Sequence, residues 1–406
     1  MTPLSVIMIG AGERGLGVYS DYVKENPNDY KFTHIVEPNF EKRKAFAKIH
    51  KIKAKNQYET LDQIDFEDTK IDFAINATPD IEHFKTTNTL LTNKIPTLLE
   101  KPIGITYNEC AELEKISKKH NTELIICHVL RYSPFYQTIK KIIKKIGYIN
   151  HIKQVEIIGI PHFTHSYVRG KWRNSKKSGP ISLTKTCHDF DIIQWFANST
   201  PLKITSYSAK SEFINKIIDK TIPDYCLQGC PIEKTCPYNS KKIYLNNSEK
   251  SWMHKDLVIN PTKDGIKKAL LTTNYGKCVY KLDNNVPDNQ NTNILFKNSI
   301  TGELIMLMTG AKSNRKIVIT GTKGVIRGNL REGIIYLNNE IIKLEKSNSH
   351  GYGDRFMLKE FVRSFKANKL NKLPTTISRS LISHKLAFLA EESRKSNELL
   401  IFNETI

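Results

Sequence analysis

The chain has 406 residues, of which 39% are hydrophobic and 25% charged, as expected of a soluble globular protein with about two domains. No apolar run reaches membrane-span length, and no charged segment precedes the first apolar run. We therefore expect a cytoplasmic protein without a signal peptide or a membrane partner. The formal charge of +21 comes from lysines spread along the chain without interleaved aromatics, so we expect no nucleic-acid partner either.

The first predicted strand, Leu4–Ile9, ends in Gly10-Ala-Gly12-Glu-Arg-Gly15, and a helical segment follows. A strand, G-x-G-x-x-G and a helix in this order are the fingerprint of a dinucleotide-binding βαβ unit. Gly10 allows the tight turn, and Gly12 lets a pyrophosphate approach the backbone. Gly15 lets the helix pack close to the strand. The alternative interpretation is a βα turn that binds nothing.

A carboxylate follows the second predicted strand. Phe32–Val36 ends in Glu37, at the spacing where an acidic side chain accepts hydrogen bonds from the ribose hydroxyls of NAD. The same charge would repel a 2′-phosphate, so the pattern favours NAD over NADP. Lys42 and Arg43 follow closely and weaken that preference.

Strands and helices continue to alternate up to about residue 128, with further strands at Ile71–Thr78, Thr97–Glu100 and Glu123–His128. This alternation predicts a Rossmann domain over residues 1–128, an α/β doubly wound parallel sheet that binds ligands beyond the carboxyl ends of its strands. The predicted cofactor-binding residues are Gly10, Gly12, Glu13, Arg14, Gly15, Glu37, Thr78, Pro79, Glu100, Lys101 and Arg131.

The pattern of predicted elements changes at about His151, where strands follow one another with short turns. Such a series predicts an antiparallel or mixed sheet, and we expect a second α/β domain over residues 129–406. Among its predicted strands are Lys277–Leu282 and Lys316–Ile326. Two helices close the chain, and Asp354 is the predicted N-cap of the first of them.

With Gly10–Gly15, Glu100-Lys101-Pro102 and Cys187-His188-Asp-Phe-Asp191, the chain resembles the Gfo/Idh/MocA family of NAD(P)-dependent oxidoreductases. The resemblance covers nearly the whole chain. It implies action on the CH–OH group of a sugar, amino sugar or cyclitol, and a large, mostly antiparallel sheet in the second domain. It also implies a homo-oligomer, either a dimer or a tetramer, and a role in sugar metabolism.

The resemblance also implies that Lys101 lies beside nicotinamide and substrate and that His188 points into the same cleft. Hydride transfer requires an acid or base for the hydroxyl proton, and these two residues suit that task. Asp191 could orient the imidazole or bind a substrate hydroxyl. Relatives often carry an aspartate four residues before the histidine. Here that position is Thr184, and Lys185 beside it could fill the gap.

Two other functions stay open. The missing carboxylate at Thr184 leaves room for an NAD-dependent enzyme that cleaves glycosides through transient oxidation of the sugar. A protein that senses NAD or sugar without catalysis is the second alternative. A buried structural histidine and a solvated lysine at a strand end are the plain interpretations of His188 and Lys101 taken singly.

A cysteine-rich insertion lies at about residues 220–245. It contains Cys226, Cys230 and Cys236 and resembles a subgroup of the family that also has a cysteine before the key histidine, here Cys187. Three clustered thiols and a distant fourth could complete a structural, tetrahedral zinc site. The alternative is reduced thiols without a metal, as is common in the cytoplasm.

Overall fold

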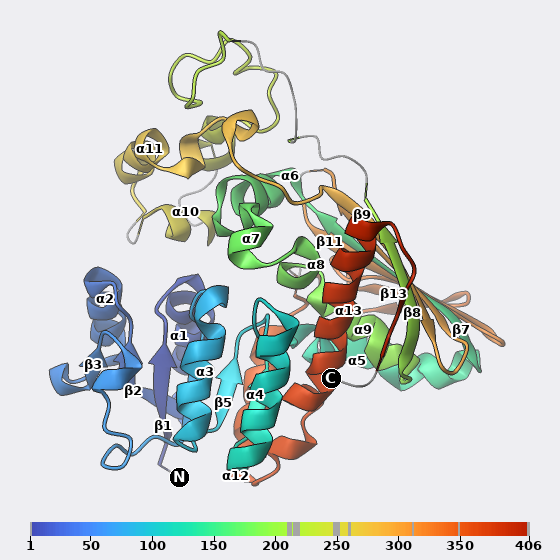
Figure 1. Ribbon diagram of the computed structural model, residues 1–406, viewed down its shortest axis with the longest axis horizontal. Coiled ribbons are helices and arrows are strands. Elements are labelled where there is room, and N and C mark those ends of the chain that lie inside the picture. The colour runs from blue at the N-terminus through green and yellow to red at the C-terminus, as the bar shows by residue number, and fades with distance from the viewer. Residues whose placement is uncertain are drawn as a thin grey trace. The chain divides into compact units, whose positions relative to one another are not determined.

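The computed structural model describes residues 2–208, 213, 220–246, 252–258, 261–310, 312–347 and 350–403. The chain forms two compact units, whose elements are labelled in Figure 1. Unit 1 combines the chain up to Gln137 with His350–Lys385, and unit 2 combines Thr138–Ser349 with Leu386–Thr405. A segment close to the C-terminus therefore belongs to the same unit as the glycine motif.

Unit 1 contains a six-stranded parallel sheet in the order β3-β2-β1-β4-β5-β6, which confirms the predicted doubly wound parallel sheet. The strands are β1 (Leu4–Ile9), β2 (Tyr30–Val36), β3 (Gln57–Tyr58), β4 (Phe73–Asn76), β5 (Thr97–Leu99) and β6 (Leu124–Ile126). The central strands β1 and β4 are mostly apolar and largely buried, as expected of a sheet covered on both faces. All strand ends that carry predicted cofactor residues therefore lie at one edge of the sheet.

The helices of unit 1 follow the strands. They are α1 (Ser20–Glu25), α2 (Phe40–His50), α3 (His83–Thr92), α4 (Tyr107–His120) and α12 (Gly353–Lys366), with α5 (Pro134–Ile142) and α13 (Ile377–Ser396) at the unit boundaries. A π-helical turn, Gly15–Tyr19, leads into α1. The predicted cap of α12 was wrong. Tyr352 takes the N-cap position, because the Asp354 carboxylate is directed to Arg14 and His350 instead.

Unit 2 contains a nine-stranded sheet in the order β14-β13-β12-β11-β7-β10-β9-β8-β15. Its strands are β7 (Ile149–Ile158), β8 (Pro201–Tyr207), β9 (Asn289–Phe296), β10 (Thr301–Met308), β11 (Asn314–Gly321), β12 (Gly324–Asn329), β13 (Ile334–Leu337), β14 (Glu340–Lys343) and β15 (Leu400–Ile401). Only the β7–β10 pair is parallel, which confirms the mostly antiparallel sheet for the described residues.

Two predicted strands of unit 2 were wrong. The run Lys316–Ile326 is divided between β11 and β12, which are joined by a tight turn. The run Lys277–Leu282 contains only a short 3-10 turn, Val279–Lys281. Its first residues instead pair with residues 224–226 across an isolated bridge.

The helices of unit 2 are short apart from α9 and α11. They are α6 (Ile160–Phe163), α7 (Ser175–Ser178), α8 (Ile181–Thr184), α9 (Cys187–Ala197), α10 (Trp252–Leu257) and α11 (Lys263–Thr272). Helix α9 packs against β7 and β10 of the sheet. In Figure 1 the yellow-green segment 220–246 lies with α10 and α11 at the top of the view, away from α9.

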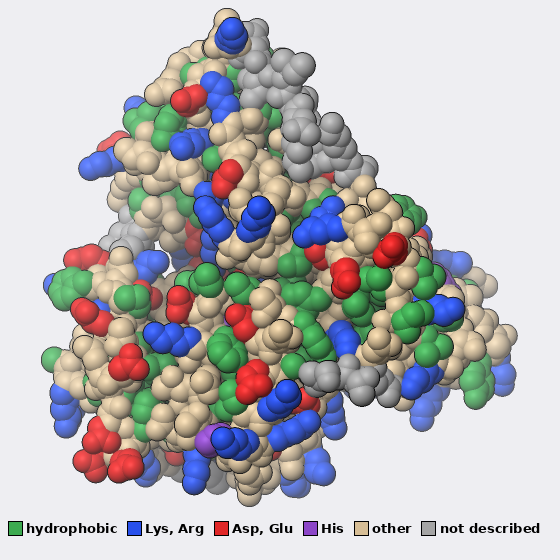
Figure 2. Space-filling model, viewed as in Figure 1, with side chains coloured by type: hydrophobic (Ala, Val, Ile, Leu, Met, Phe, Trp, Pro, Cys, Tyr) green, Lys and Arg blue, Asp and Glu red, His purple; other side chains and the backbone are tan. Residues whose placement is uncertain are grey.

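Charged side chains are mixed on the surface. On the face in Figure 2, lysine and arginine side chains lie among acidic and uncharged ones rather than in one stripe. Within the described residues, no helix combines the length and the apolar character needed to cross a membrane.

Candidate active site

The three glycines of the first loop differ in what surrounds them. Gly10 has a φ of +88°, and a Cβ there would lie 2.8 Å from Ala77 O. A Cβ on Gly15 would lie 2.7 Å from Gly10 O. At Gly12, no atom of the described residues beyond its two chain neighbours comes within 4 Å of the Cβ position. Packing therefore explains the first and last glycines, whereas Gly12 leaves open space at the backbone, as the approach of a pyrophosphate requires.

Glu37 is turned toward this loop. Its Oε2 accepts a hydrogen bond from Ala11 N–H at 2.8 Å, and its Oε1 accepts one from Asn39 N–H at 2.9 Å. The nearby Arg43 donates to Glu37 O and pairs with Glu59 at 2.9 Å. Each carboxylate oxygen of Glu37 keeps a further lone pair for a hydroxyl donor. The guanidinium of Arg43 already has partners of its own.

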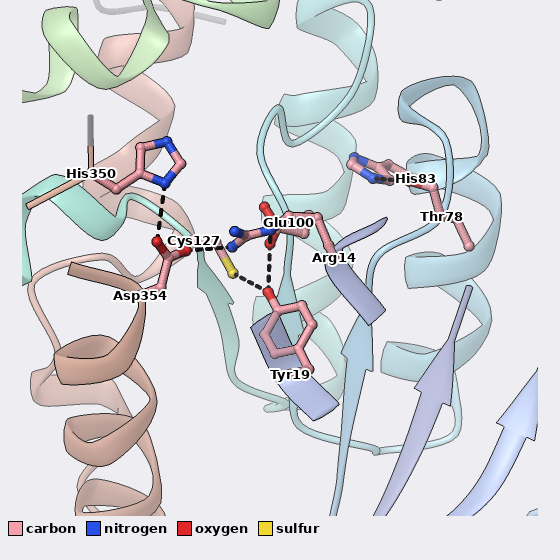
Figure 3. A network of polar contacts seen from close by, with 8 residues as sticks. All are labelled: Arg14, Tyr19, Thr78, His83, Glu100, Cys127, His350 and Asp354. Atoms are coloured by element: carbon pink, nitrogen blue, oxygen red, sulfur yellow. Dashed lines mark hydrogen bonds and ion pairs between the residues drawn. The ribbon is translucent and has the colours of Figure 1, made fainter. Parts of the chain in front are cut away.

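Arg14 joins the glycine loop to two other segments of unit 1 (Figure 3). Its Nε lies 2.5 Å from Glu100 Oε1, and its Nη2 lies 2.6 Å from Asp354 Oδ1. Tyr19 OH donates to the same Glu100 oxygen at 2.6 Å, and His350 Nδ1 lies 3.0 Å from Asp354 Oδ2. One cation thus stands between two carboxylates. Arg14, predicted to bind the cofactor, holds the loop in position by these bonds.

The network changes the acidity of Asp354. Burial alone would raise the pKa of this carboxyl, but the opposite charge of Arg14 and the bond to His350 outweigh burial. The pKa of Asp354 is therefore held far below its ordinary value, so the group is ionised at all physiological pH values. The same two carboxylates, together with Tyr19, raise the pKa of Arg14 against the effect of burial.

Thr78 and the turn after β4 are held by two residues that sequence reasoning missed. Asn76 Oδ1 accepts hydrogen bonds from the N–H and the hydroxyl of Thr78, at 3.3 and 2.9 Å. The ring of His83 bridges Thr78 O and Pro102 O, at 3.0 and 2.6 Å. A neutral imidazole can donate to only one of these carbonyls. His83 therefore connects two of the predicted cofactor segments, which its place in the sequence does not reveal.

The structure places Glu13, Pro79, Lys101 and Arg131 in unit 1, with the other predicted cofactor residues. Lys101 follows β5 and is half-buried. It lies close enough to His128 to act on that ring, whose pKa is lowered first by burial and then by Arg131 and Lys101. Arg131 is buried, and its Nη1 donates to Pro374 O at 2.9 Å. That bond gives Arg131 a structural partner.

His188 and Asp191 lie in α9 of unit 2. Both side chains are buried, and they stand one helical turn apart, as predicted from their spacing. Thr184 ends α8 and donates its hydroxyl to Pro180 O at 3.2 Å. The roles of His188 and Asp191 in catalysis stay predictions.

Lys185 belongs to a buried charge network that the sequence did not reveal. Its Nζ lies 2.9 Å from Glu156 Oε1. Arg315 pairs with Glu156 at 2.8 Å and with Asp189 at 2.9 Å, and Gln154 donates to Asp189 at 2.9 Å. Two cations and two carboxylates thus balance in the interior. Burial lowers the pKa of Lys185 and raises that of Glu156.

The predicted zinc ligands are not brought together as expected. Among the described residues, no group of three or more His, Cys, Asp or Glu side chains is arranged to hold a metal ion. Cys187 begins α9, whereas Cys226, Cys230 and Cys236 lie on the segment 220–246 at the other end of unit 2 (Figure 1). The geometry therefore gives no support to Cys187 as a zinc ligand.

Residues 4–128 match a family model described as the oxidoreductase family with an NAD-binding Rossmann fold, GFO_IDH_MocA. The match covers the parallel sheet and the glycine loop, so these residues resemble the NAD-binding domain that the model describes. The resemblance to the Gfo/Idh/MocA family that the sequence indicated is confirmed over this domain.

Two curated proteins resemble part of the chain. YteT of Bacillus subtilis (strain 168), named as an inferred oxidoreductase, is 22% identical over 57% of this chain and 54% of its own length. The 2,7-anhydro-N-acetylneuraminate hydratase of Escherichia coli (strain K12) is 23% identical over 48% of this chain and 51% of its own. The chain thus spans about half the length of these relatives.

Solved structures share the whole fold. A scyllo-inositol dehydrogenase from Lactobacillus casei with bound NAD(H) and scyllo-inositol has a TM-score of 0.68 at 16% identity, covering 98% of this chain and 99% of its own. An oxidoreductase from Agrobacterium radiobacter in complex with NAD+, L-tartaric acid and magnesium has a TM-score of 0.69 at 14% identity, covering 98% of each chain. At these identities the likeness is one of fold.

Proposed function

We propose that the chain is an NAD-dependent oxidoreductase that transfers a hydride between nicotinamide and a hydroxyl or carbonyl carbon of a sugar, amino sugar or cyclitol. The observation that carries the proposal is the open space at Gly12, next to a carboxylate that is already bonded to the same loop. A dinucleotide would find there both a backbone that it can approach and an acceptor for its ribose hydroxyls.

The residues present fit NAD. Gly10, Gly12 and Gly15 would cradle the pyrophosphate, and Glu37 would accept from the ribose. The negative charge of Glu37 would repel the 2′-phosphate of NADP, which supports NAD as the cofactor. The guanidinium of Arg43, which could attract that phosphate, is already paired with Glu59. When bound, NAD supplies the acceptor or donor of the hydride.

The remaining chemistry is the movement of the substrate's hydroxyl proton. We assign His188 as the acid or base that exchanges this proton, because histidine titrates in the useful range. Lys101 would donate a hydrogen bond to the same substrate oxygen and stabilise negative charge that develops on it. Asp191 would orient the imidazole or bind a second hydroxyl. Thr184 has no carboxylate, and Lys185 beside it is the candidate to take over the role of the aspartate expected there. The bond of Lys185 to Glu156 also makes this lysine part of the buried charge network.

A second function has specific support. The relative named a hydratase adds or removes water, which leaves no net redox change. Thr184 in place of a carboxylate also departs from simple alcohol oxidation. An NAD-dependent enzyme that oxidises the sugar only transiently, such as a glycoside-cleaving enzyme, is therefore the alternative.

One assay separates these functions. The purified protein is incubated with NAD and a panel of cyclitols, sugars and glycosides, while reduced nicotinamide is followed by absorbance and products by chromatography. Net formation of reduced nicotinamide supports the oxidoreductase. Product release without it supports transient oxidation, and NAD binding without any product supports a sensor. Light scattering of the same sample tests the proposed dimer or tetramer.

A further inference from the structure

Two cysteines of unit 2 flank one short antiparallel contact. Residues 224–226 pair with residues 276–278 through two backbone hydrogen bonds of 2.9 and 2.7 Å, one on each side of the central residue pair. Because side chains alternate along paired segments, Cys226 and Cys278 project from the same face. They are diagonal neighbours, a relationship that places such residues about 7–8 Å apart. Two thiolates on one ion can span that separation, since each metal–sulfur bond adds about 2.3 Å.

Cys230 and Cys236 lie on the turns that follow Cys226. The N–H of Cys236 donates to Ile232 O at 2.9 Å and folds the segment back. Burial raises the pKa of the Cys236 and Cys278 thiols. Cys236 also packs against the apolar cluster that contains Val279, the residue after Cys278. All of these cysteines have free thiols.

A buried cation faces the same thiols. The side chain of Arg169 is 1% exposed, and its Nη2 donates to Cys226 Sγ at 3.6 Å and to Tyr238 O at 2.7 Å. Its Nε donates to Lys277 O at 2.9 Å. Within the described residues, its Nη1 has no hydrogen-bond partner and no carboxylate pairs with its charge. A guanidinium buried without a counter-charge is costly, so an anion is expected beside it.

We propose that Cys226, Cys230, Cys236 and Cys278 together bind one structural Zn²⁺. Binding releases four thiol protons and leaves a complex with a net charge of −2, since four thiolates surround a divalent ion. That complex provides the counter-charge for Arg169. Among the described residues no three of these thiols are arranged to hold a metal ion, so coordination requires the cysteines to move closer together. Cys278 takes the place that the sequence had assigned to Cys187.

The ion would stabilise the insertion rather than take part in the reaction, because four thiolates leave no open coordination position. The segment 220–246 consists largely of turns, and most of its cysteine-bearing part lies outside a packed core. A bound metal commonly replaces a hydrophobic core in segments of this kind. The site therefore does not depend on the proposed NAD chemistry.

The test is metal analysis of the full-length protein, expressed with added zinc and purified without chelators. We expect about one zinc ion per chain, and no comparable amount of iron or acid-labile sulfide. The Cys278→Ser variant should lose most of the zinc, whereas Cys187→Ser and Cys110→Ser, which change other buried cysteines, should keep it. Thermal unfolding of the wild type should shift downward after zinc is removed by a chelator.

A second substitution of Cys278 keeps the test valid if the Cys278→Ser variant fails to fold. Cys278→His keeps a zinc-binding atom and should retain the metal. Cobalt substituted into the wild-type protein should show thiolate-to-cobalt charge-transfer bands and the visible bands of tetrahedral geometry. A metal-free wild type, iron and sulfide in place of zinc, or zinc that is lost in Cys187→Ser but kept in Cys278→Ser would each overturn the proposal.

Discussion

The guanidinium of Arg14 lies 2.5 Å from the carboxylate of Glu100, so the glycine loop is bonded to the residue that directly precedes Lys101. The second bond of Arg14, to Asp354, reaches a helix from the other end of the chain. A change in the loop is therefore transmitted to the residue that we propose as a substrate ligand.

Replacing Arg14 with Met should weaken both folding and NAD binding. The change leaves Glu100 and Asp354 as neighbouring carboxylates without their cation, at a cost of at most about 3–5 kcal/mol. Urea unfolding and NAD titration by calorimetry would measure the two effects. Arg355→Met is the control, because Arg355 pairs with Glu25 at an exposed site, where a pair contributes only about 0–1 kcal/mol. Equal stability of the two variants would show that the network is unimportant.

Asp354 should make stability depend on pH in the acid range. Its pKa in the folded protein is depressed, so the unfolded chain binds more protons than the folded chain between that value and the ordinary pKa of about 4. The free energy of unfolding should therefore rise with pH across this window and be fully present above about pH 5. In Asp354→Asn the slope below pH 4 should be smaller. An unchanged slope in urea unfolding at several pH values would contradict this.

Gly12 and Gly15 should respond differently to a side chain. Gly12→Val should fold with an unchanged Tm and fail to bind NAD, because the Cβ position has open space around it and the side chain occupies the space for the pyrophosphate. Gly15→Ala should lower Tm, since its Cβ would press on Gly10 O. Calorimetric titration with NAD and thermal unfolding of both variants provide the comparison. Tight NAD binding by Gly12→Val would mean that the cofactor lies elsewhere.

His188→Ala should lower kcat by about two to four orders of magnitude while NAD still binds, as expected after loss of an acid or base. Steady-state kinetics on the substrate found in the panel, together with NAD titration, would measure both quantities. His151→Ala is a suitable control, because that histidine lies half-exposed on β7. Turnover close to that of the wild type would remove His188 from the mechanism.

Arg315→Met should destabilise unit 2 by about 3–5 kcal/mol, because Glu156 and Asp189 would lose their shared buried cation. Lys185→Met should cost less, since Arg315 would still pair with Glu156. Arg327→Met, on the exposed side of β12, should change stability by less than about 0.5 kcal/mol. Urea unfolding of the three variants gives the order of their stabilities directly. A smaller loss of stability in Arg315→Met than in Lys185→Met would refute the predicted order.

Local signals explain what the sequence predicted well. The run Leu4–Ile9, the glycines after it and the carboxylate of Glu37 all lie within one βαβ unit, where residue type and spacing decide structure. The structure shows that unit with the predicted strands, and Glu37 faces the loop.

Contacts between distant segments account for what was missed. Arg14 and Asp354 are separated by 340 positions, and no pattern in either segment indicates their ion pair. Cys278 was predicted to lie in a strand, Lys277–Leu282, and only the bridge to residues 224–226 shows it beside Cys226. The partners of Arg315 likewise come from a helix and a strand that are far away in sequence.

The return of α12 to unit 1 has a consequence for how the protein is made. Phe361 of α12 stacks edge-on against Phe73 of β4, with ring centroids 4.9 Å apart, within the same apolar cluster as Val6. During synthesis on the ribosome, part of the apolar surface of the first sheet stays uncovered until more than 200 further residues have emerged. Nascent chains that stall between the two parts of this unit should therefore be targets for chaperones, and the cofactor domain cannot mature ahead of the rest of the chain.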